Sequence, residues 1–319
     1  MNKLLGKYVD HQMTSPLEMA HHSAKIKPLA TDLAKSGILL VATCLRVEAY
    51  GEESRLRSLD KAVFSDFSYK SVAGTVAIAQ RLAEIASGAH SQILGENYIS
   101  EQLTKATEFL DPTLPIRQIA RLAIDVGRAS RERQRFIASF NYDQIVRDII
   151  TDRFQYGEAP DCFYMIGAGM LGREFLRSGV GEKFRSTVVI TRNPKNLRKR
   201  LRSFTDRKVS FIRPAELGSV PEPRSIVIIA TTDVNDDYKT ILQDALLRLG
   251  PRTIVDLSSL PVLSETVASK LSYVSMYDRE FLHFINKNNE HLEQQRSALC
   301  SDIEDTLRMV PIDVSARTT

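Results

Sequence analysis

Three glycines at a fixed spacing constrain the fold of this chain more than any other feature. Gly167, Gly169 and Gly172 stand in FYMIGAGMLGREFL, directly after an apolar run and directly before a helical pattern. In a strand–turn–helix unit the first glycine makes the tight turn, the second admits a pyrophosphate, and the third lets helix and strand pack closely. The helix N-terminus supplies N–H donors to the phosphates. The spacing therefore predicts a dinucleotide-binding unit of the Rossmann type.

Short apolar runs surround this turn in the second half of the chain. They alternate with helical stretches and read CFYMIG, TVVIT, VSFI, SIVIIAT, TIVDL and YVSM. Such alternation is typical of a parallel sheet with crossover helices. We expect this domain to span residues 158–277 and to be followed by a connecting helix and tail over 278–319.

The first half of the chain has a different pattern, and we expect residues 1–157 to form an α+β domain. Strands are predicted at 37–42 and near 47–50, and helices dominate from about residue 75. Gly88 is expected to end the first of these helices and Pro115 to precede the next. Their predicted buried stripes are Val76, Ala79, Leu82, Ala83 and Ala86 in one, and Ile116, Ile119, Ala120 and Ala123 in the other.

The end of the second predicted strand in the Rossmann unit favours NADPH over NADH. An NAD site carries an acidic residue about 20 residues after the glycines, where it binds the ribose 2′-hydroxyl. This chain has Thr191, Arg192 and Asn193 there and no acid. Arg192, with Lys195 or Arg198 nearby, would instead neutralise a 2′-phosphate.

Composition and charge narrow the class of protein. No apolar stretch approaches the roughly 18 residues that a membrane span requires. Three widely separated cysteines argue against a disulfide framework and against a zinc site, so we expect no metal and a cytoplasmic location. The net charge of +4 is mild, but basic residues cluster in RLAIDVGRASRERQRF and in NLRKRLRSFTDRK. Either run can be a solvated helix face or a phosphate-binding surface.

Cys44 lies where an apolar run gives way to polar residues, in LLVATCLRVEAYG. A thiol combined with a nicotinamide cofactor suggests reduction of an activated acyl group through a thioester. The alternative is a packed small side chain, which is the common fate of a free cysteine. Because Arg46 follows closely, we expect part of the Cys44 population to be thiolate.

The segments around these residues resemble glutamyl-tRNA reductase, the first committed enzyme of five-carbon tetrapyrrole biosynthesis. ATCLRVEAYG is similar to the S-T-C-N-R-x-E-x-Y segment of that family, and ASGAHSQILGENYISEQLTKA to its A-S-G-L-D-S and G-E segments. VGRASRERQRFIAS, IGAGMLG, TRNPKNL, ATTD and IVDLSSLP follow in the family's order, and DHQMTSPLE resembles its N-H-x-T-A-P.

The resemblance implies specific roles. Cys44 would form the glutamyl thioester, Arg46 would bind the carboxylate of the substrate, and Thr43, Ser91 and Gln102 would complete the pocket. NADPH, held by Gly167, Gly169, Gly172 and Arg192, would reduce the thioester to glutamate-1-semialdehyde. Charged tRNA(Glu) would be the partner, together with the downstream aminomutase. Arg121, Arg128, Arg131 and Arg135 are expected on one helical stripe that meets the tRNA backbone, with Arg133 pointing away.

The chain also departs from the family's pattern. Leu45 replaces the asparagine after the cysteine, Tyr98 replaces a glutamine, and no histidine lies at residues 72–74. His90 takes the place of an aspartate and is a candidate proton donor. We expect a short, divergent member that lacks the family's C-terminal dimerisation domain. Two alternatives stay open: an NADPH-dependent reductase of another activated acyl donor, and a non-catalytic NADPH-binding relative.

Overall fold

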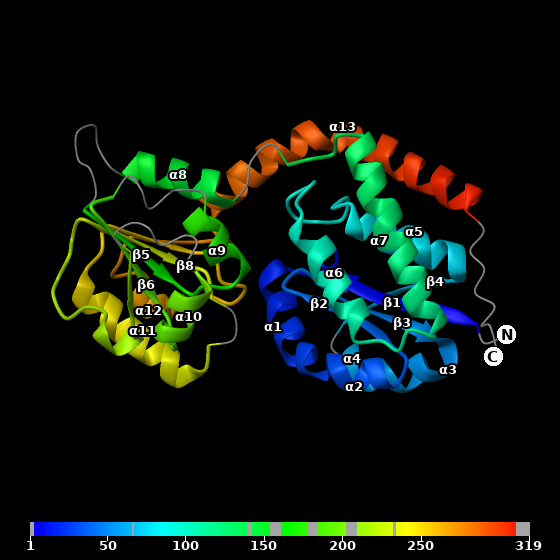
Figure 1. Cartoon of the computed structure of the whole chain (residues 1–319), viewed down its shortest axis with the longest axis horizontal. Helices are drawn as coiled ribbons and strands as arrows, with labels where there is room; N and C mark the ends of the chain where they lie inside the picture. The colour runs from blue at the N-terminus through cyan, green and yellow to red at the C-terminus, as the bar shows by residue number, and fades with distance from the viewer. Residues whose placement is uncertain are drawn as a thin grey trace. The chain divides into compact units, whose positions relative to one another are not determined.

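The computed structural model describes residues 3–65, 67–138, 142–153, 161–177, 184–201, 209–231 and 234–310 (Figure 1). The chain forms two compact units. Unit 1 comprises Met1–Ser139 and Ile285–Thr319, and unit 2 comprises Phe140–Phe284. The division falls at Ser139 and not near the expected residue 158, because helix α8 (Tyr142–Arg153) packs against helix α9 (Met170–Arg177) and strand β9 (Thr253–Asp256) of unit 2. Helix α13 (Arg279–Met309) begins in unit 2 and gives most of its length to unit 1.

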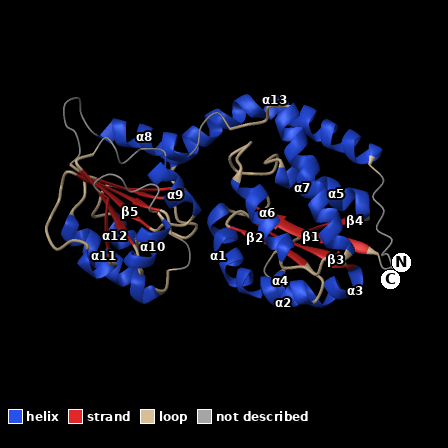
Figure 2. Ribbon diagram, viewed as in Figure 1, coloured by secondary structure: helices blue, strands red, loops and turns tan. Residues whose placement is uncertain are grey.

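Unit 1 contains a four-stranded antiparallel sheet with the order β2-β3-β1-β4 (Figure 2). The strands are β1 (Leu4–Asp10), β2 (Leu39–Thr43), β3 (Arg46–Glu52) and β4 (Lys70–Ala73). The two strands predicted from the sequence are therefore confirmed, as a hairpin in which Thr43 pairs with Arg46.

Helices cover both faces of this sheet. The helices are α1 (Pro16–Ile26), α2 (Ala30–Lys35), α3 (Glu53–Leu56), α4 (Asp60–Val63), α5 (Thr75–Ala86), α6 (Tyr98–Glu108), α7 (Pro115–Arg133) and the larger part of α13. Alternate residues of β2 face opposite cores, since Leu40 packs with α1, α3 and α4 whereas Leu39 and Val41 pack with α5, α6, α7 and α13. Strands β2 and β3 are thus largely buried on both sides, whereas β4 at the edge is mostly exposed.

The predicted helical stripes of unit 1 are largely confirmed. Gly88, at φ 84°, ends the first helix as expected. Four of the five residues predicted for the buried stripe of this helix are buried, whereas Val76 is 52 % exposed. All four predicted residues of α7 are buried. Gly127 of α7 allows close packing on α5, because a Cβ atom there would lie 2.3 Å from the Ala83 carbonyl oxygen.

Unit 2 contains a six-stranded parallel sheet with the order β10-β9-β8-β5-β6-β7. Its strands are β5 (Cys162–Ile166), β6 (Ser186–Ile190), β7 (Val209–Ile212), β8 (Ser225–Ile229), β9 (Thr253–Asp256) and β10 (Tyr273–Ser275). The helices besides α8 are α9 (Met170–Arg177), α10 (Pro194–Arg200), α11 (Asp236–Leu249) and α12 (Glu265–Ala268). Numbered from β5, this is the Rossmann order 3-2-1-4-5-6, which places the topological switch between β5 and β8. The predicted α/β fold class is confirmed.

Candidate active site

Cys44 lies in the two-residue turn of the β2–β3 hairpin. Thr43, the last residue of β2, accepts a hydrogen bond on Oγ1 from the Leu45 N–H at 3.2 Å. The Leu45 carbonyl accepts from the His11 N–H at 2.9 Å, which ties the turn to the end of β1. These bonds fix the backbone on both sides of the cysteine, and the Cys44 side chain is half-buried.

The electrostatics of Cys44 differ from the expectation. Burial raises the pKa of the thiol to about 11, and the nearby Glu96 carboxylate acts in the same direction. Arg46 and Lys27 lower this pKa by less. The predicted thiolate population is therefore wrong, because the cost of burying the anion exceeds the stabilisation from the neighbouring cations. Cys44 is a protonated thiol at neutral pH.

Arg46 is only 1 % exposed, and its guanidinium is already engaged. One terminal nitrogen donates to Glu48 Oε1 at 3.2 Å and the other donates to the His90 carbonyl. Its Nε has no partner among the described residues. Arg46 thus connects strand β3 to the loop that begins at His90.

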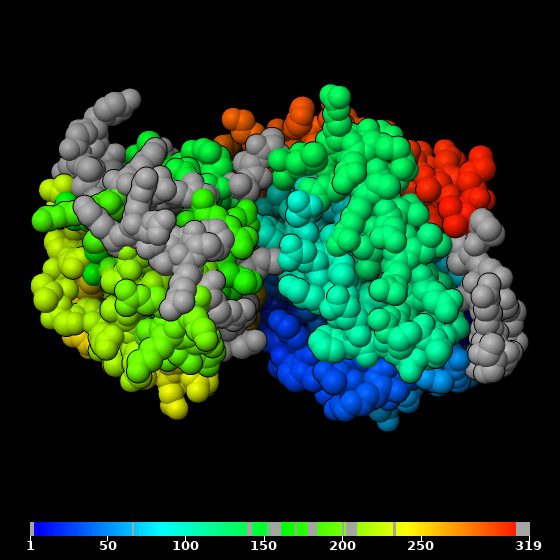
Figure 3. Space-filling view, in the orientation of Figure 1, coloured from blue at the N-terminus to red at the C-terminus, as the bar shows by residue number. Residues whose placement is uncertain are grey.

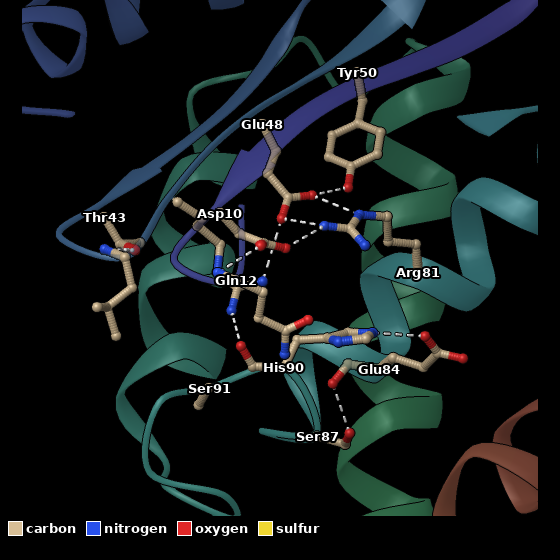
Figure 4. A network of polar contacts seen from close by, with 12 residues as sticks. Asp10, Gln12, Thr43, Glu48, Tyr50, Arg81, Glu84, Ser87, His90 and Ser91 are labelled. Carbon is tan, nitrogen blue, oxygen red and sulfur yellow. Dashed lines mark hydrogen bonds and ion pairs between the residues drawn. The ribbon is translucent and has the colours of Figure 1, made fainter. Parts of the chain in front are cut away.

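Glu48 is the centre of a buried ionic network (Figure 4). Arg81 from α5 forms two hydrogen bonds with its carboxylate, at 2.9 and 2.8 Å, and also reaches Asp10 at 3.4 Å. The Tyr50 hydroxyl donates to the same carboxylate. Burial opposes ionisation of Glu48, but Arg81 and Arg46 outweigh it and hold the pKa of this carboxyl below its ordinary value. The network fixes β1, β3 and α5 around the hairpin turn.

The loop from His90 to Asn97 lies beside the cysteine turn and carries Ser91 and Glu96. The Ser91 hydroxyl donates to Glu96 Oε1 at 2.9 Å. Glu96 also accepts from the Tyr98 and Ile99 N–H groups, so its carboxylate caps α6. Burial raises the pKa of Glu96. No catalytic or binding role was predicted for this carboxyl, although it belongs to the G-E segment.

Two of the predicted site residues, His90 and Gln102, lie in different surroundings. His90 Nε2 lies 2.8 Å from Glu84 Oε2, and Figure 4 shows this ring on the side of the network that faces α5. Burial raises and the His90 contact lowers the pKa of Glu84, with a net shift downward, so Glu84 is a carboxylate that accepts from His90. Gln102 is exposed on α6. The structure therefore pairs Thr43 with Arg46 beside Cys44, links Arg46 to the backbone of His90, and pairs Ser91 with Glu96, whereas Gln102 lies at the surface.

His11 is a polar residue near the turn to which sequence reasoning gave no role. Its Nδ1 is buried without a partner among the described residues. Burial, followed by the charge of Arg46, lowers the pKa of its ring. Its place in DHQMTSPLE was the available signal.

The glycine turn of unit 2 has the geometry that a dinucleotide requires. Gly167 has φ 93°, and a Cβ atom there would lie 2.5 Å from the Ala230 carbonyl oxygen. A Cβ atom on Gly172 would lie 2.3 Å from the Gly167 carbonyl oxygen. At Gly169, by contrast, no atom lies within 4 Å of the added Cβ, so the space in front of the turn is open. Close packing at two glycines and open space at the middle one fit a pyrophosphate at the N-terminus of α9.

Arg192 stands two residues after β6 and is exposed. Its guanidinium lies 5.9 Å from the centre of the Tyr238 ring. The neighbouring Asn193 side chain accepts from the Asn196 N–H at 3.1 Å and caps α10. Lys195 and Arg198 on that helix are also exposed. The cations are thus at the carboxyl end of the second strand of the Rossmann unit.

The predicted arginine stripe is partly wrong. Arg131 is 7 % exposed and donates to the carbonyls of Gly95, Glu96 and Phe136 at 2.6, 3.2 and 3.1 Å. Arg135 lies beyond the end of α7 and has φ 51°. Arg133 points away as expected and pairs with Asp302 at 2.6 Å. Only Arg121 and Arg128 remain as exposed members of the stripe on α7.

Helix α7 covers much of one face of unit 1 (Figure 3). Arg121 and Arg128 border a groove of about 390 Å³ that also includes Thr104, Glu108 and Asp125. Ser100 and Thr104 accept hydrogen bonds from Arg128 at 2.8 and 3.0 Å and hold it in place. The groove therefore has mixed charge.

Two further properties concern the described ranges of the chain. Within them, no three His, Cys, Asp or Glu side chains come together as a metal site. Of the helices in the same ranges, none combines the length and apolar character that crossing a bilayer requires.

Comparison with known proteins gives a consistent set of relatives. The family model "Glutamyl-tRNAGlu reductase, N-terminal domain" matches residues 11–119. Protein nfe2 of Rhizobium meliloti is 54% identical over 307 residues, which cover 96% of this chain and 99% of that protein. Glutamyl-tRNA reductase of Clostridium beijerinckii is 23% identical over 271 residues, or 81% of this chain, and the match spans 65% of that reductase. A solved glutamyl-tRNA reductase from Methanopyrus kandleri is 21% identical, covers 96% of this chain and 81% of that chain, and has a TM-score of 0.42.

Proposed function

This chain belongs to the same family as Protein nfe2, a divergent part of the glutamyl-tRNA reductase family, and on that premise we propose that it is an NADPH-dependent reductase of an activated acyl group. In its specific form, the proposal is reduction of the glutamyl group of glutamyl-tRNA(Glu) to glutamate-1-semialdehyde, the first step of tetrapyrrole biosynthesis. The observation that carries it is the presentation of Cys44 in a fixed hairpin turn beside the loop of Ser91 and Glu96.

The first chemical step forms a thioester. Cys44 Sγ bonds to the acyl carbon while the bond between that carbon and the leaving oxygen breaks, and the thiol proton ends on the leaving oxygen. Because the pKa of Cys44 is about 11, a neighbouring group must take the proton as attack proceeds. We propose His90 for this role, because its backbone carbonyl is bound by Arg46 and its ring is held by Glu84.

The residues of unit 2 fit the cofactor. Gly167, Gly169 and Gly172 with the N-terminus of α9 would hold the pyrophosphate, and Arg192 would bind the 2′-phosphate. Bound there, NADPH would supply the hydride that reduces the thioester to an aldehyde.

The engagement of Arg46 favours a second candidate, the reduction of another activated acyl donor. A substrate carboxylate is best bound by a free guanidinium fork, whereas both terminal nitrogens of Arg46 donate to groups of the protein itself. Glutamate recognition by Arg46 would require Nε alone or a displaced Glu48. The thioester chemistry at Cys44 does not depend on this choice.

We propose charged tRNA as the macromolecular partner. Arg121 and Arg128, the exposed arginines of the stripe on α7, would contact its phosphates. Their replacement by alanine should weaken binding to the same extent for any tRNA sequence and should reduce the salt dependence of affinity by about two phosphates' worth. The aldehyde would pass to an aminomutase, and the free cysteines fit a cytoplasmic location.

Incubation with NADPH and glutamyl-tRNA(Glu), followed by detection of aldehyde, tests the function. Cys44→Ser should abolish aldehyde formation while keeping the fold and NADPH binding, and Cys162→Ser, inside unit 2, is the matched control. Aldehyde from another acyl donor only would support the second candidate. Absence of aldehyde and of any Cys44 thioester with every donor would identify a non-catalytic NADPH-binding relative.

A further inference from the structure

The loop from His90 to Asn97 is held mainly through its own carbonyl groups. Side chains from β3 and α7 bind three of them, since Arg46 donates to the His90 carbonyl and Arg131 donates to those of Gly95 and Glu96. Gly88, which precedes the loop, and Gly95 within it have positive φ values of 84° and 75°, and they allow the irregular backbone of this region. Such a loop has little regular structure of its own, so its shape depends on these side-chain donors.

Helix α13 provides two further side-chain donors through adjacent residues, Asn288 and Asn289. Asn289 donates from Nδ2 to the Gln92 carbonyl at 2.7 Å and accepts on Oδ1 from the Leu94 N–H at 3.0 Å. Asn288 donates to the Leu94 carbonyl at 3.2 Å and is 1 % exposed. The Asn289 side chain therefore binds one backbone carbonyl and one backbone N–H group of the loop, as the backbone of a neighbouring strand would. These contacts join residues nearly 200 positions apart in the chain.

We propose that Asn288 and Asn289 are positioning residues of the Cys44 site, which hold the loop so that His90, Ser91 and Glu96 lie beside the thiol. This inference rests on the proposed function for its significance, because a thioester-forming cysteine needs fixed neighbours. Neither asparagine touches the reacting atoms. Because α13 begins in unit 2, the pair also ties the site to a helix that both units share.

The size of the effect follows from the number of bonds removed. Asn289→Ala deletes two hydrogen bonds to the loop, and each contributes about a factor of five to an opening equilibrium. The loop should therefore open about 25-fold more often. Asn289→Asp keeps the acceptor for the Leu94 N–H and should give a smaller increase. Asn286→Ala is the matched control, since Asn286 is exposed on the same helix.

Hydrogen exchange of the segment 91–97 and alkylation of Cys44 relative to Cys300 measure the loop without requiring turnover. We expect Asn289→Ala to speed exchange in this segment by 10-fold or more and to raise the Cys44 alkylation rate, with exchange in β1 and β3 unchanged. Rates within twofold of the Asn286→Ala control would overturn the inference. An increase spread equally over unit 1 would also overturn it, because that is the result of a general loss of stability.

These outcomes separate the inference from the proposed function. If wild-type protein makes no aldehyde but the loop responds as expected, the proposed function fails and the positioning contacts stand. If the protein is active, Asn289→Ala should lower kcat by a larger factor than it changes the KM for NADPH, since the cofactor residues lie in unit 2.

Discussion

The reactivity of Cys44 toward iodoacetamide tests the electrostatics of the candidate site. The thiolate is the reacting species, and the pKa of this thiol is about 11 instead of the ordinary 9.0. At pH 7.5 both values lie well above the pH, so the difference lowers the thiolate fraction about 100-fold relative to an unperturbed cysteine. The alkylation rate should rise about tenfold for each pH unit up to pH 10.

Two substitutions should change this rate in opposite directions. Glu96 raises and Lys27 lowers the pKa of Cys44. At pH 8, Glu96→Gln should therefore speed alkylation by about three- to tenfold, and Lys27→Gln should slow it. Glu101→Gln is the matched control, because Glu101 is an exposed carboxylate on α6. Mass spectrometry of the alkylated peptides follows Cys44 separately from Cys162 and Cys300.

The midpoint of the pH profile for Cys44 alkylation is expected near pH 11. A Cys44 midpoint at or below pH 9 would refute it, because the thiol would then be unaffected by burial or would be stabilised as thiolate by Arg46. An unchanged rate in both Glu96→Gln and Lys27→Gln would show that these charges do not act on the thiol.

Three further substitutions test the other parts of the molecule. Arg192→Ala should narrow the preference for NADPH over NADH by about 10- to 150-fold and leave NADH affinity almost unchanged in fluorescence titrations; equal affinity of the unmutated protein for both cofactors would contradict this. Gly169→Ala should leave the melting temperature unchanged but weaken NADPH binding, whereas Gly172→Ala should lower the melting temperature, since only the second Cβ meets backbone; the reverse pattern would show that the turn is misassigned. Arg131→Ala should destabilise unit 1 by roughly 3 kcal/mol in urea unfolding, and a change below 0.5 kcal/mol would mean that its carbonyl contacts are unimportant.

The features that followed from local pattern were predicted well. The six strands of unit 2 were visible in the sequence as short apolar runs. The turn at Gly167, Gly169 and Gly172 was predictable from the spacing of the glycines, because the conformation of such a turn depends on only a few neighbouring residues. The β2–β3 hairpin was also predictable, since β2 is an apolar run and the residues after Cys44 alternate. The helical stripe of α5 was right except at Val76, which lies in its first turn.

The features that depend on distant partners could not be predicted. Arg128 and Arg131 were both predicted to lie on the same stripe of α7. Arg128 is exposed, whereas Arg131 is buried and donates to backbone carbonyls. The difference depends on the path of the loop from His90 to Asn97, which a local sequence pattern does not determine. The protonated state of Cys44 likewise depends on burial, which no motif encodes. The boundary at Ser139 depends on which unit α8 packs against.

The discontinuity of unit 1 sets the order in which the chain can fold. Its core includes Leu292, Leu299, Ile303 and Leu307 of α13, together with residues of β2, α5 and α7. During synthesis the strands of unit 1 emerge first, but this core stays open until the last part of α13 has left the ribosome. Unit 2, which is continuous, can close earlier. A fragment that ends at the close of unit 2 would therefore carry a complete nucleotide-binding fold attached to an unfinished domain with an exposed apolar surface, and the hairpin that presents Cys44 would belong to the unfinished part.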